Sequence, residues 1–232
     1  MQDSGLVSTV PFGDIHMIDM SRVRTASVRR AKALKYPINA ALPHRAIGRM
    51  RMRSQQEIIH RTVALQMVFA LRFGFDRDRG LAWLRCNGHR EWFTGGETEF
   101  LDNDIGRIPK ESIQRIEAQV ECQWALAWVL GFIRKLSFKS YCGDNLVHMF
   151  PNFKIDESME AFLARSKPKR RSIEEVIEME DLAYCLHWGI VESRIQLKRA
   201  PGKVDPYVII ERRRALSWVL GDGPWDDMPM DT

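Results

Sequence analysis

Residues 109–133, PKESIQRIEAQVECQWALAWVLGFI, contain the longest apolar run of the chain, Trp124 to Ile133. Pro109 suits the first turn of a helix, because proline lacks an amide hydrogen that this turn leaves unpaired in any case. Apolar residues then recur at helical spacing from Ile113 to Trp128. The second half is apolar nearly all round, which is typical of a buried helix. We therefore expect one long central helix over 109–133 in an all-α domain.

Three further helices are expected to pack around this central one, over 54–73, 172–197 and 206–220. Two of them begin with capping boxes, in which a serine hydroxyl and a glutamate three residues later satisfy free amides at the helix start. The first box is Ser54-Gln55-Gln56-Glu57 and the second is Ser172-Ile173-Glu174-Glu175. Pro206 and Gly221 bound the last helix.

Weaker signals complete a single domain over residues 21–232. Ser21 is positioned to cap a helix that ends before Pro37, and shorter helices are expected over 78–86, 145–150 and 157–165. Residues 37–53 and the glycine-rich 87–108 read as loops. Residues 1–20 read as an irregular N-terminal arm, with a short strand over 6–10.

The bulk composition favours a soluble cytoplasmic protein. The chain has 232 residues, 45% of them hydrophobic, and a net charge of +5. No signal-peptide pattern opens it, and the longest apolar run, Trp124 to Ile133, is about half of the roughly 20 residues that a membrane helix needs. The cysteines show no metal-binding spacing and read as reduced thiols. They are Cys86, Cys122, Cys142 and Cys185. We expect no cofactor and no bound metal.

The C-terminal third carries a composite motif. Asp181, Tyr184 and His187-Trp188 come first, followed by Glu211-Arg212-Arg213-Arg214-Ala215-Leu216-Ser217-Trp218 and then by Trp225-Asp226-Asp227 and Asp231-Thr232. This pattern resembles the end of the bacterial domain-of-unknown-function 4272 family, DUF4272, although Ser217 stands where that family often has asparagine. The resemblance implies a helical domain, and it implies no activity.

The polar residues of this motif allow two interpretations. Asp181, Tyr184 and His187 are three apart and share one helix face. In a functional site, Asp181 would orient His187 as an acid or base, and Glu211 or Arg212 would complete a pocket. In a structural network, Arg212 or His187 would instead bind Asp181, Asp226 or Asp231 and hold the tail against the last two helices. The full candidate set is Asp181, Tyr184, His187, Glu211, Arg212, Asp226, Asp227 and Asp231.

Other site classes have weaker patterns. Asp226, Asp227 and Asp231 with His187 offer metal ligands, but the alternating oxygens and central glycine of a calcium loop are absent. The basic stretches 44–53 and 165–171 lack the interleaved aromatics of single-strand binders, so nucleic acid is a distant third possibility. Trp92-Phe93 in its glycine-rich loop, together with Arg45 and Arg49, are candidate contacts for a protein partner.

The sequence favours a non-enzymatic domain that binds a protein partner. The version we expect is an immunity or antitoxin-like protein that blocks an acidic toxin, since opposite charge speeds encounter. The alternative is a small hydrolase-like enzyme that uses His187 with Asp181 and with Glu211 or Arg212. The sequence indicates neither the identity of the partner nor the oligomeric state.

Overall fold

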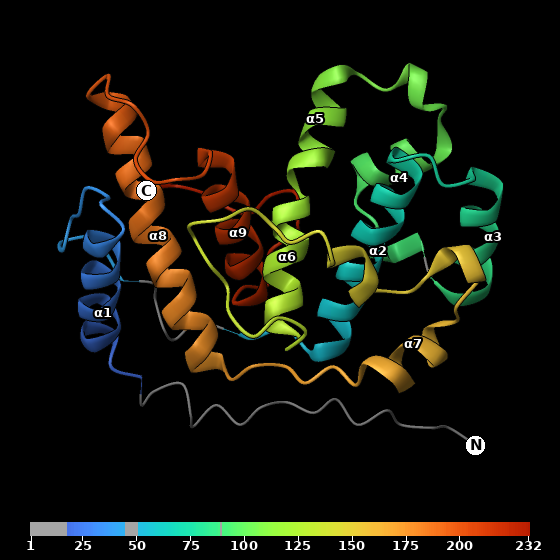
Figure 1. Cartoon of the computed structure of the whole chain (residues 1–232), viewed down its shortest axis with the longest axis horizontal. Helices are drawn as coiled ribbons and strands as arrows, with labels where there is room; N and C mark the ends of the chain where they lie inside the picture. The colour runs from blue at the N-terminus through green and yellow to red at the C-terminus, as the bar shows by residue number, and fades with distance from the viewer. Residues whose placement is uncertain (1–17, 45–50, 89) are drawn as a thin grey trace.

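Helix α6 (Val120–Val129) lies at the centre of the structure, a computed structural model that describes residues 18–44, 51–88 and 90–232. All of its residues except Val120 and Trp124 are buried. It packs against α9 (Pro206–Val219) on one side and α2 (Gln55–Arg72) on the other (Figure 1). The expected central apolar helix is therefore confirmed.

The remaining helices form two groups on either side of this centre. Helix α8 (Ile173–Ile195) packs against α9, and α1 (Met20–Ala33) covers the outer side of α8 (Figure 1). The other group lies around and beyond α2 and comprises α3 (Arg77–Asn87), α4 (Gly95–Asp102), α5 (Lys110–Ala118) and α7 (Met159–Ser166). One hydrophobic core runs through both groups, as expected for a single all-α domain. The described residues contain no strand, and none of their helices is long and apolar enough to cross a membrane.

The expected single helix over 109–133 is wrong in its continuity. It divides into α5 and α6 at Gln119, where the amide turns back to the carbonyls of Ile116 and Glu117. The buried Gln119 side chain accepts a hydrogen bond from the Trp225 indole nitrogen at 2.8 Å. A contact with the C-terminal tail therefore accompanies the break, and no glycine or proline marks it in the sequence.

The same helix also ends earlier than expected, at Val129. Gly131 follows with φ of +81°, where a Cβ atom would lie 2.6 Å from the Lys169 carbonyl oxygen. The amides of Lys169 and Arg171 donate to the last carbonyls of α6, at 3.0 and 2.9 Å. The basic linker therefore caps the central helix, and Arg171 extends over the Trp128 ring, 4.5 Å from its centroid.

The expected loop over 87–108 is also wrong, because it contains α4. Thr94 and Glu97 form a third capping box, in which each side chain accepts from the other residue's backbone amide. Gly95 and Gly96 occupy the first turn with open space around them. The serine boxes at Ser54 and Ser172 are confirmed.

Helix α1 begins and ends earlier than expected. Asp19, and not Ser21, is its N-cap, because the Asp19 carboxylate accepts from the amides of Ser21 and Arg22. The helix ends at Ala33, and Lys35 then takes a positive φ of 65° before Pro37. Most of the predicted N-terminal arm, residues 1–17 with its strand over 6–10, lies outside the described residues.

Candidate functional site

Most motif residues of α8 and α9 are buried in the protein interior. Asp181, His187, Glu211 and Arg212 are all buried, and Arg212 is the largest fully buried side chain of the described chain. Burial of this many ionisable groups is costly unless each one is paired. Each of these groups therefore needs a partner in the interior.

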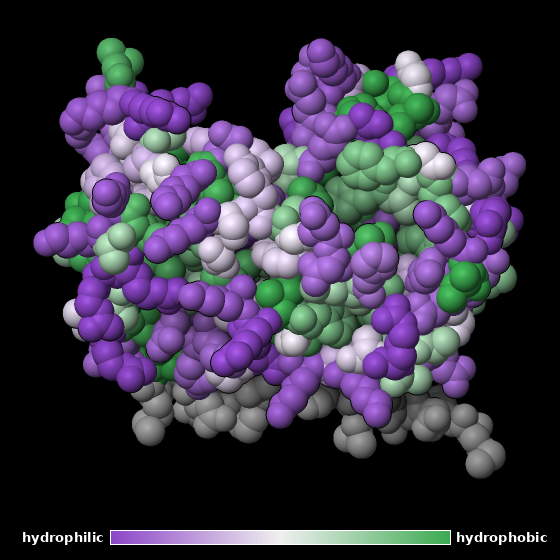
Figure 2. Space-filling view, in the orientation of Figure 1, coloured by the Kyte–Doolittle hydropathy of each residue, from purple (hydrophilic) through white to green (hydrophobic). Residues whose placement is uncertain are grey.

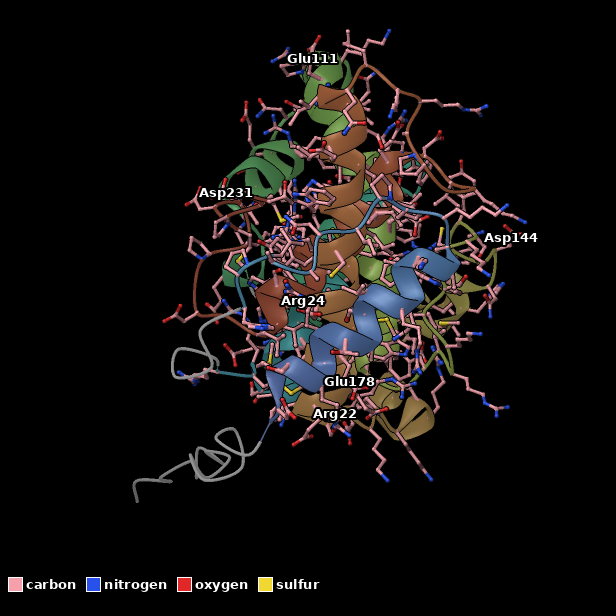
Figure 3. All side chains as sticks on the ribbon, turned by 90° about the vertical axis from the view of Figure 1, so that its left-hand side faces the viewer. Arg22, Arg24, Glu111, Asp144, Glu178 and Asp231 are labelled. Atoms are coloured by element: carbon pink, nitrogen blue, oxygen red, sulfur yellow. The ribbon has the colours of Figure 1, made fainter. Side chains whose placement is uncertain are left out.

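Asp181 is bound by Arg24 of α1. The Arg24 guanidinium donates to both carboxylate oxygens, with Nη2 2.7 Å from Oδ1 and Nε 3.2 Å from each oxygen. Its Nη1 donates to the Leu42 carbonyl at 2.6 Å. Burial alone would lower the pKa of Arg24, but the Asp181 carboxylate outweighs this effect and raises it. Figure 3, which looks onto α1, marks the position of Arg24.

His187 lies against Arg213 and not against the neighbouring Arg212, which we expected to complete the site. Nδ1 of His187 is 2.6 Å from Nη1 of Arg213, so this ring nitrogen accepts and carries no proton. Burial, and then the neighbouring guanidinium, lower the pKa of His187 to about 4. At neutral pH the imidazole is therefore uncharged, and its Nδ1 is already engaged.

Arg213 also holds the C-terminal tail. It donates to the carbonyl oxygens of Met230 at 3.3 Å and Asp231 at 2.8 Å, and it lies over the Tyr184 ring, 4.5 Å from the centroid. Trp225 anchors the start of the tail, buried edge-on against Trp218. The tail is thus bound through its backbone and one indole, while the carboxylates of the tail aspartates make no ion pair with any described residue.

Arg212 lies in a different place from Arg213. It donates from Nε and Nη2 to Glu121 of α6, at 2.8 and 2.5 Å, and to the carbonyls of Ser137 and Ser140. Glu211 accepts from the Cys122 thiol at 3.1 Å. Consecutive residues of α9 therefore point to different neighbours, and neither Glu211 nor Arg212 joins His187 and Asp181.

A small pocket of about 160 Å³ adjoins the contact between α8 and the tail. Asp181, Tyr184 and Arg213 line it together with Asp231 of the tail, while His187, Glu211 and Arg212 do not. The Tyr184 hydroxyl makes no hydrogen bond to a described residue. The candidate residues are thus divided among a pocket, a histidine–arginine contact and a separate buried ion pair.

Residues 22–228 match the sequence pattern of the family described as Domain of unknown function (DUF4272). This match covers most of the chain. The chain belongs to this family. No curated protein and no solved structure is detectably similar to it.

The DUF4272 motif therefore includes buried ion pairs that link its helices and a contact that holds its tail. The expected network had Arg212 or His187 bound to Asp181 or to a tail aspartate, and those pairings are wrong. Asp181 pairs with Arg24, Arg212 pairs with Glu121, and His187 contacts Arg213. Asp226, Asp227 and Asp231 are exposed. Among the residues that the structure describes, no three His, Cys, Asp or Glu side chains gather as metal ligands would.

The candidate partner contacts near Trp92 are less accessible than expected. Phe93 is buried, and Trp92 is half-buried and stacks on His60 with 4.1 Å between the ring centroids. Arg45 and Arg49 lie outside the described residues. In the basic linker, Arg170 and Arg171 donate to backbone carbonyls, and Arg165 pairs with Glu157. The linker guanidiniums are therefore engaged within the protein.

Sequence reasoning missed the three residues that complete these contacts, namely Arg24, Glu121 and Arg213. Arg24 and Glu121 stand in other helices, far along the chain from their partners, and no local pattern distinguishes them. Arg213 lies inside the motif, but the sequence-based interpretation assigned its contacts with His187 and the tail to the neighbouring Arg212. Helical spacing offered a signal for Arg213, because only one of two consecutive residues can face α8.

Proposed function

We propose that this chain is a non-enzymatic, cytoplasmic protein-binding domain. The observation that carries the proposal is an exposed aromatic pair formed by Tyr141 and Tyr207. Tyr141 is 46% exposed and Tyr207 is 38% exposed, and the centroids of their rings lie 6.4 Å apart. The Tyr141 hydroxyl donates to the Asp205 carboxylate at 2.9 Å, which fixes one ring without burying it. Tyrosines held in this way are typical anchors of protein interfaces.

The pair adjoins further exposed apolar side chains. Tyr141 belongs to the irregular segment 134–158, which also exposes Val147 and Ile155 and crosses in front of α6 and α9 (Figure 1). On the face shown in Figure 2, apolar residues lie among hydrophilic ones, and the larger green areas are on the right, on the side where α2, α3 and α4 lie in Figure 1. Binding on this side would therefore depend on a few anchoring side chains with a polar surround.

The more specific proposal is an immunity or antitoxin-like role, in which the domain binds and blocks a toxin. It rests on a single small domain, on the net charge of +5, and on motif charges that are paired with residues of other helices. A toxin-blocking protein needs a surface and no chemistry of its own. This fits a motif whose ionised groups are buried in pairs.

Co-expression with the products of the genes that flank its own gene tests this proposal. Each product is expressed with the tagged chain, and co-purification and relief of growth arrest are measured. We expect one product to co-purify, to arrest growth alone and to be neutralised by the chain. Tyr141→Ala/Tyr207→Ala should weaken binding by about 10-fold or more, since anchors of this kind contribute about 1–2 kcal/mol each. Phe73→Ala removes an exposed aromatic elsewhere and is the matched control.

A hydrolase-like enzyme is the alternative function, and the pocket beside the motif favours it. Asp181 lines that pocket, but Arg24 already binds both of its oxygens. His187 lies outside the lining, and Arg212 lies on Glu121. An enzyme of this kind would have to use Tyr184 or Asp231 instead of the expected set. Nucleic-acid binding ranks third, since the linker arginines are engaged with carbonyls and with Glu157.

A further inference from the structure

The charge of the chain is distributed very unevenly. Residues 20–38, 139–145 and 198–207 carry ten of its 35 Lys and Arg but only two of its 30 Asp and Glu. This excess of eight is larger than the net charge of +5, so the rest of the chain is net acidic. We call these three segments the basic face. Such an asymmetry indicates where an oppositely charged molecule would be attracted.

Two contacts bring the three segments together. The Tyr36 ring, just beyond α1, packs against Gly202, where a Cβ atom would overlap the Tyr36 hydroxyl oxygen. Asp205 is hydrogen-bonded to Tyr141 in both directions, at 2.9 and 3.4 Å. The end of α1, the turn before α9 and the start of the 134–158 segment therefore adjoin one another.

Most cations of the basic face are exposed and available. Arg29, Lys32 and Lys35 project from α1 and its end, and none of them forms an ion pair with a described residue. The exposed Lys139, Arg199 and Lys203 extend the same charge around the aromatic pair. The exceptions are Arg24, which is buried on Asp181, and Arg22, which lies 3.8 Å from the exposed Glu178. Arg30 also donates to the Met179 sulfur at 3.9 Å, and Lys198 donates to the Gln196 side chain at 2.7 Å.

The face is also firmly supported. Val23, Ser27 and Ala31 are buried on the inner side of α1, and the Arg24–Asp181 pair ties this helix to α8. Hydrophilic residues cover much of the side where α1 lies, on the left of Figure 2, and Figure 3 views that side directly. The backbone that carries the cations is therefore already ordered before a partner binds.

We propose that the basic face is the surface on which an acidic protein partner docks, with Tyr141 and Tyr207 as its apolar anchor. This inference rests on the proposed function, because it specifies the chemistry of the same partner. A protein fits better than nucleic acid, since α1 has no aromatic ring and the Tyr141 and Tyr207 rings are tilted by 38° to each other, so they offer no parallel faces between which a base could stack.

Charge reversal at the basic face tests the inference. Association of the wild-type chain with each flanking gene product is measured over a range of salt, beside Arg29→Glu/Lys32→Glu. Lys110→Glu/Arg115→Glu is the matched control, because it reverses two exposed charges on α5, away from α1 in Figures 1 and 3. We expect the α1 reversal to slow association by about 10-fold or more at low salt, and the control by less than about 2-fold. Circular dichroism should show the same helical content for the wild type and both variants.

The other outcomes separate this inference from the proposed function. If a flanking product binds and the α1 reversal leaves its association rate unchanged, the basic face is not the docking surface, while the proposed function stands. If no product binds the wild-type chain, both fail. Duplex DNA and phosphatidylserine vesicles are tested in parallel. The chain could bind DNA or the vesicles, lose that binding in the α1 reversal, and bind no protein partner. This result would overturn the inference in favour of a different polyanion.

Discussion

The guanidinium of Arg24 and the carboxylate of Asp181, 157 positions apart in the chain, form a buried bidentate pair. Both side chains are about 95% buried, and the pair links α1 to α8. Asp181 is a signature residue, yet its two oxygens are engaged by a residue outside the signature. This relationship shows how a motif that suggests chemistry can instead fix the packing of helices.

Removal of one member of this pair should be far more costly than removal of both. Asp181→Ala leaves the Arg24 charge buried without its partner, and we expect a loss of about 3–5 kcal/mol in the free energy of unfolding. The double variant Arg24→Met/Asp181→Leu should recover most of that loss. Urea unfolding measures both. Glu178→Ala, at an exposed and longer pair with Arg22, is the control and should cost less than about 1 kcal/mol. Equal losses in the single and double variants would refute a buried ion pair.

Arg213→Lys should release the C-terminal tail. Arg213 reaches two tail carbonyls with its fork, whereas a lysine ammonium cannot span both positions. We expect faster hydrogen exchange in the amides of residues 224–232 and a loss of about 1–3 kcal/mol. Arg214→Lys, a partly exposed neighbour that pairs with Glu211, should leave the tail protected. Unchanged exchange in Arg213→Lys would mean that other contacts hold the tail.

Stability should fall in mild acid because of His187. Its pKa is about 4 in the folded chain against an ordinary 6.5, so the unfolded chain binds the proton more readily. The contribution is fully present above about pH 6.5 and is lost as pH falls toward 4, by about 3 kcal/mol in total. His187→Gln should flatten this part of the pH profile, while His148→Gln, at an exposed site, should not. Identical profiles for wild type and His187→Gln would contradict the lowered pKa.

Gly202→Ala should destabilise the protein, because it disturbs the contact that joins two segments of the basic face. Gly202 has φ of +94°, and a Cβ atom there would overlap the Tyr36 hydroxyl oxygen. Strain and overlap together should cost about 1–3 kcal/mol. Gly106→Ala is the control, since a Cβ atom there meets nothing within 4 Å. Thermal unfolding that shifts equally for both variants would argue against the contact between Tyr36 and Gly202.

Local chemistry made much of the fold predictable. The serine capping boxes located the starts of α2 and α8, and the apolar run located the central helix. The capping box of α4 was equally readable as Thr94-x-x-Glu97, but Gly95 and Gly96 suggested a loop. The break at Gln119 could not be foreseen, because its accompanying contact is Trp225 of the distant tail.

The site was less predictable than the fold, since the partners of its charged residues come from other helices. Helical spacing placed Asp181 and His187 correctly on α8 and allows only one of Arg212 and Arg213 to face that helix, but nothing local selects Arg24 as the partner of Asp181. A buried charge requires a counter-charge, and the sequence offers many arginines that could supply it. Only the packing of α1 against α8, and of α9 against α6, decides the pairing.

The signature maintains the fold, whereas the proposed function places partner binding on an exposed face. The most direct test uses a flanking gene product that the wild-type chain neutralises. The affinity of His187→Gln for this product is compared with that of Tyr141→Ala/Tyr207→Ala, both at neutral pH. We predict that His187→Gln binds within about 2-fold of wild type and that the tyrosine variant binds about 10-fold or more weakly. If His187→Gln loses binding or neutralisation while the tyrosine variant keeps both, the signature itself is the functional site and the account is wrong.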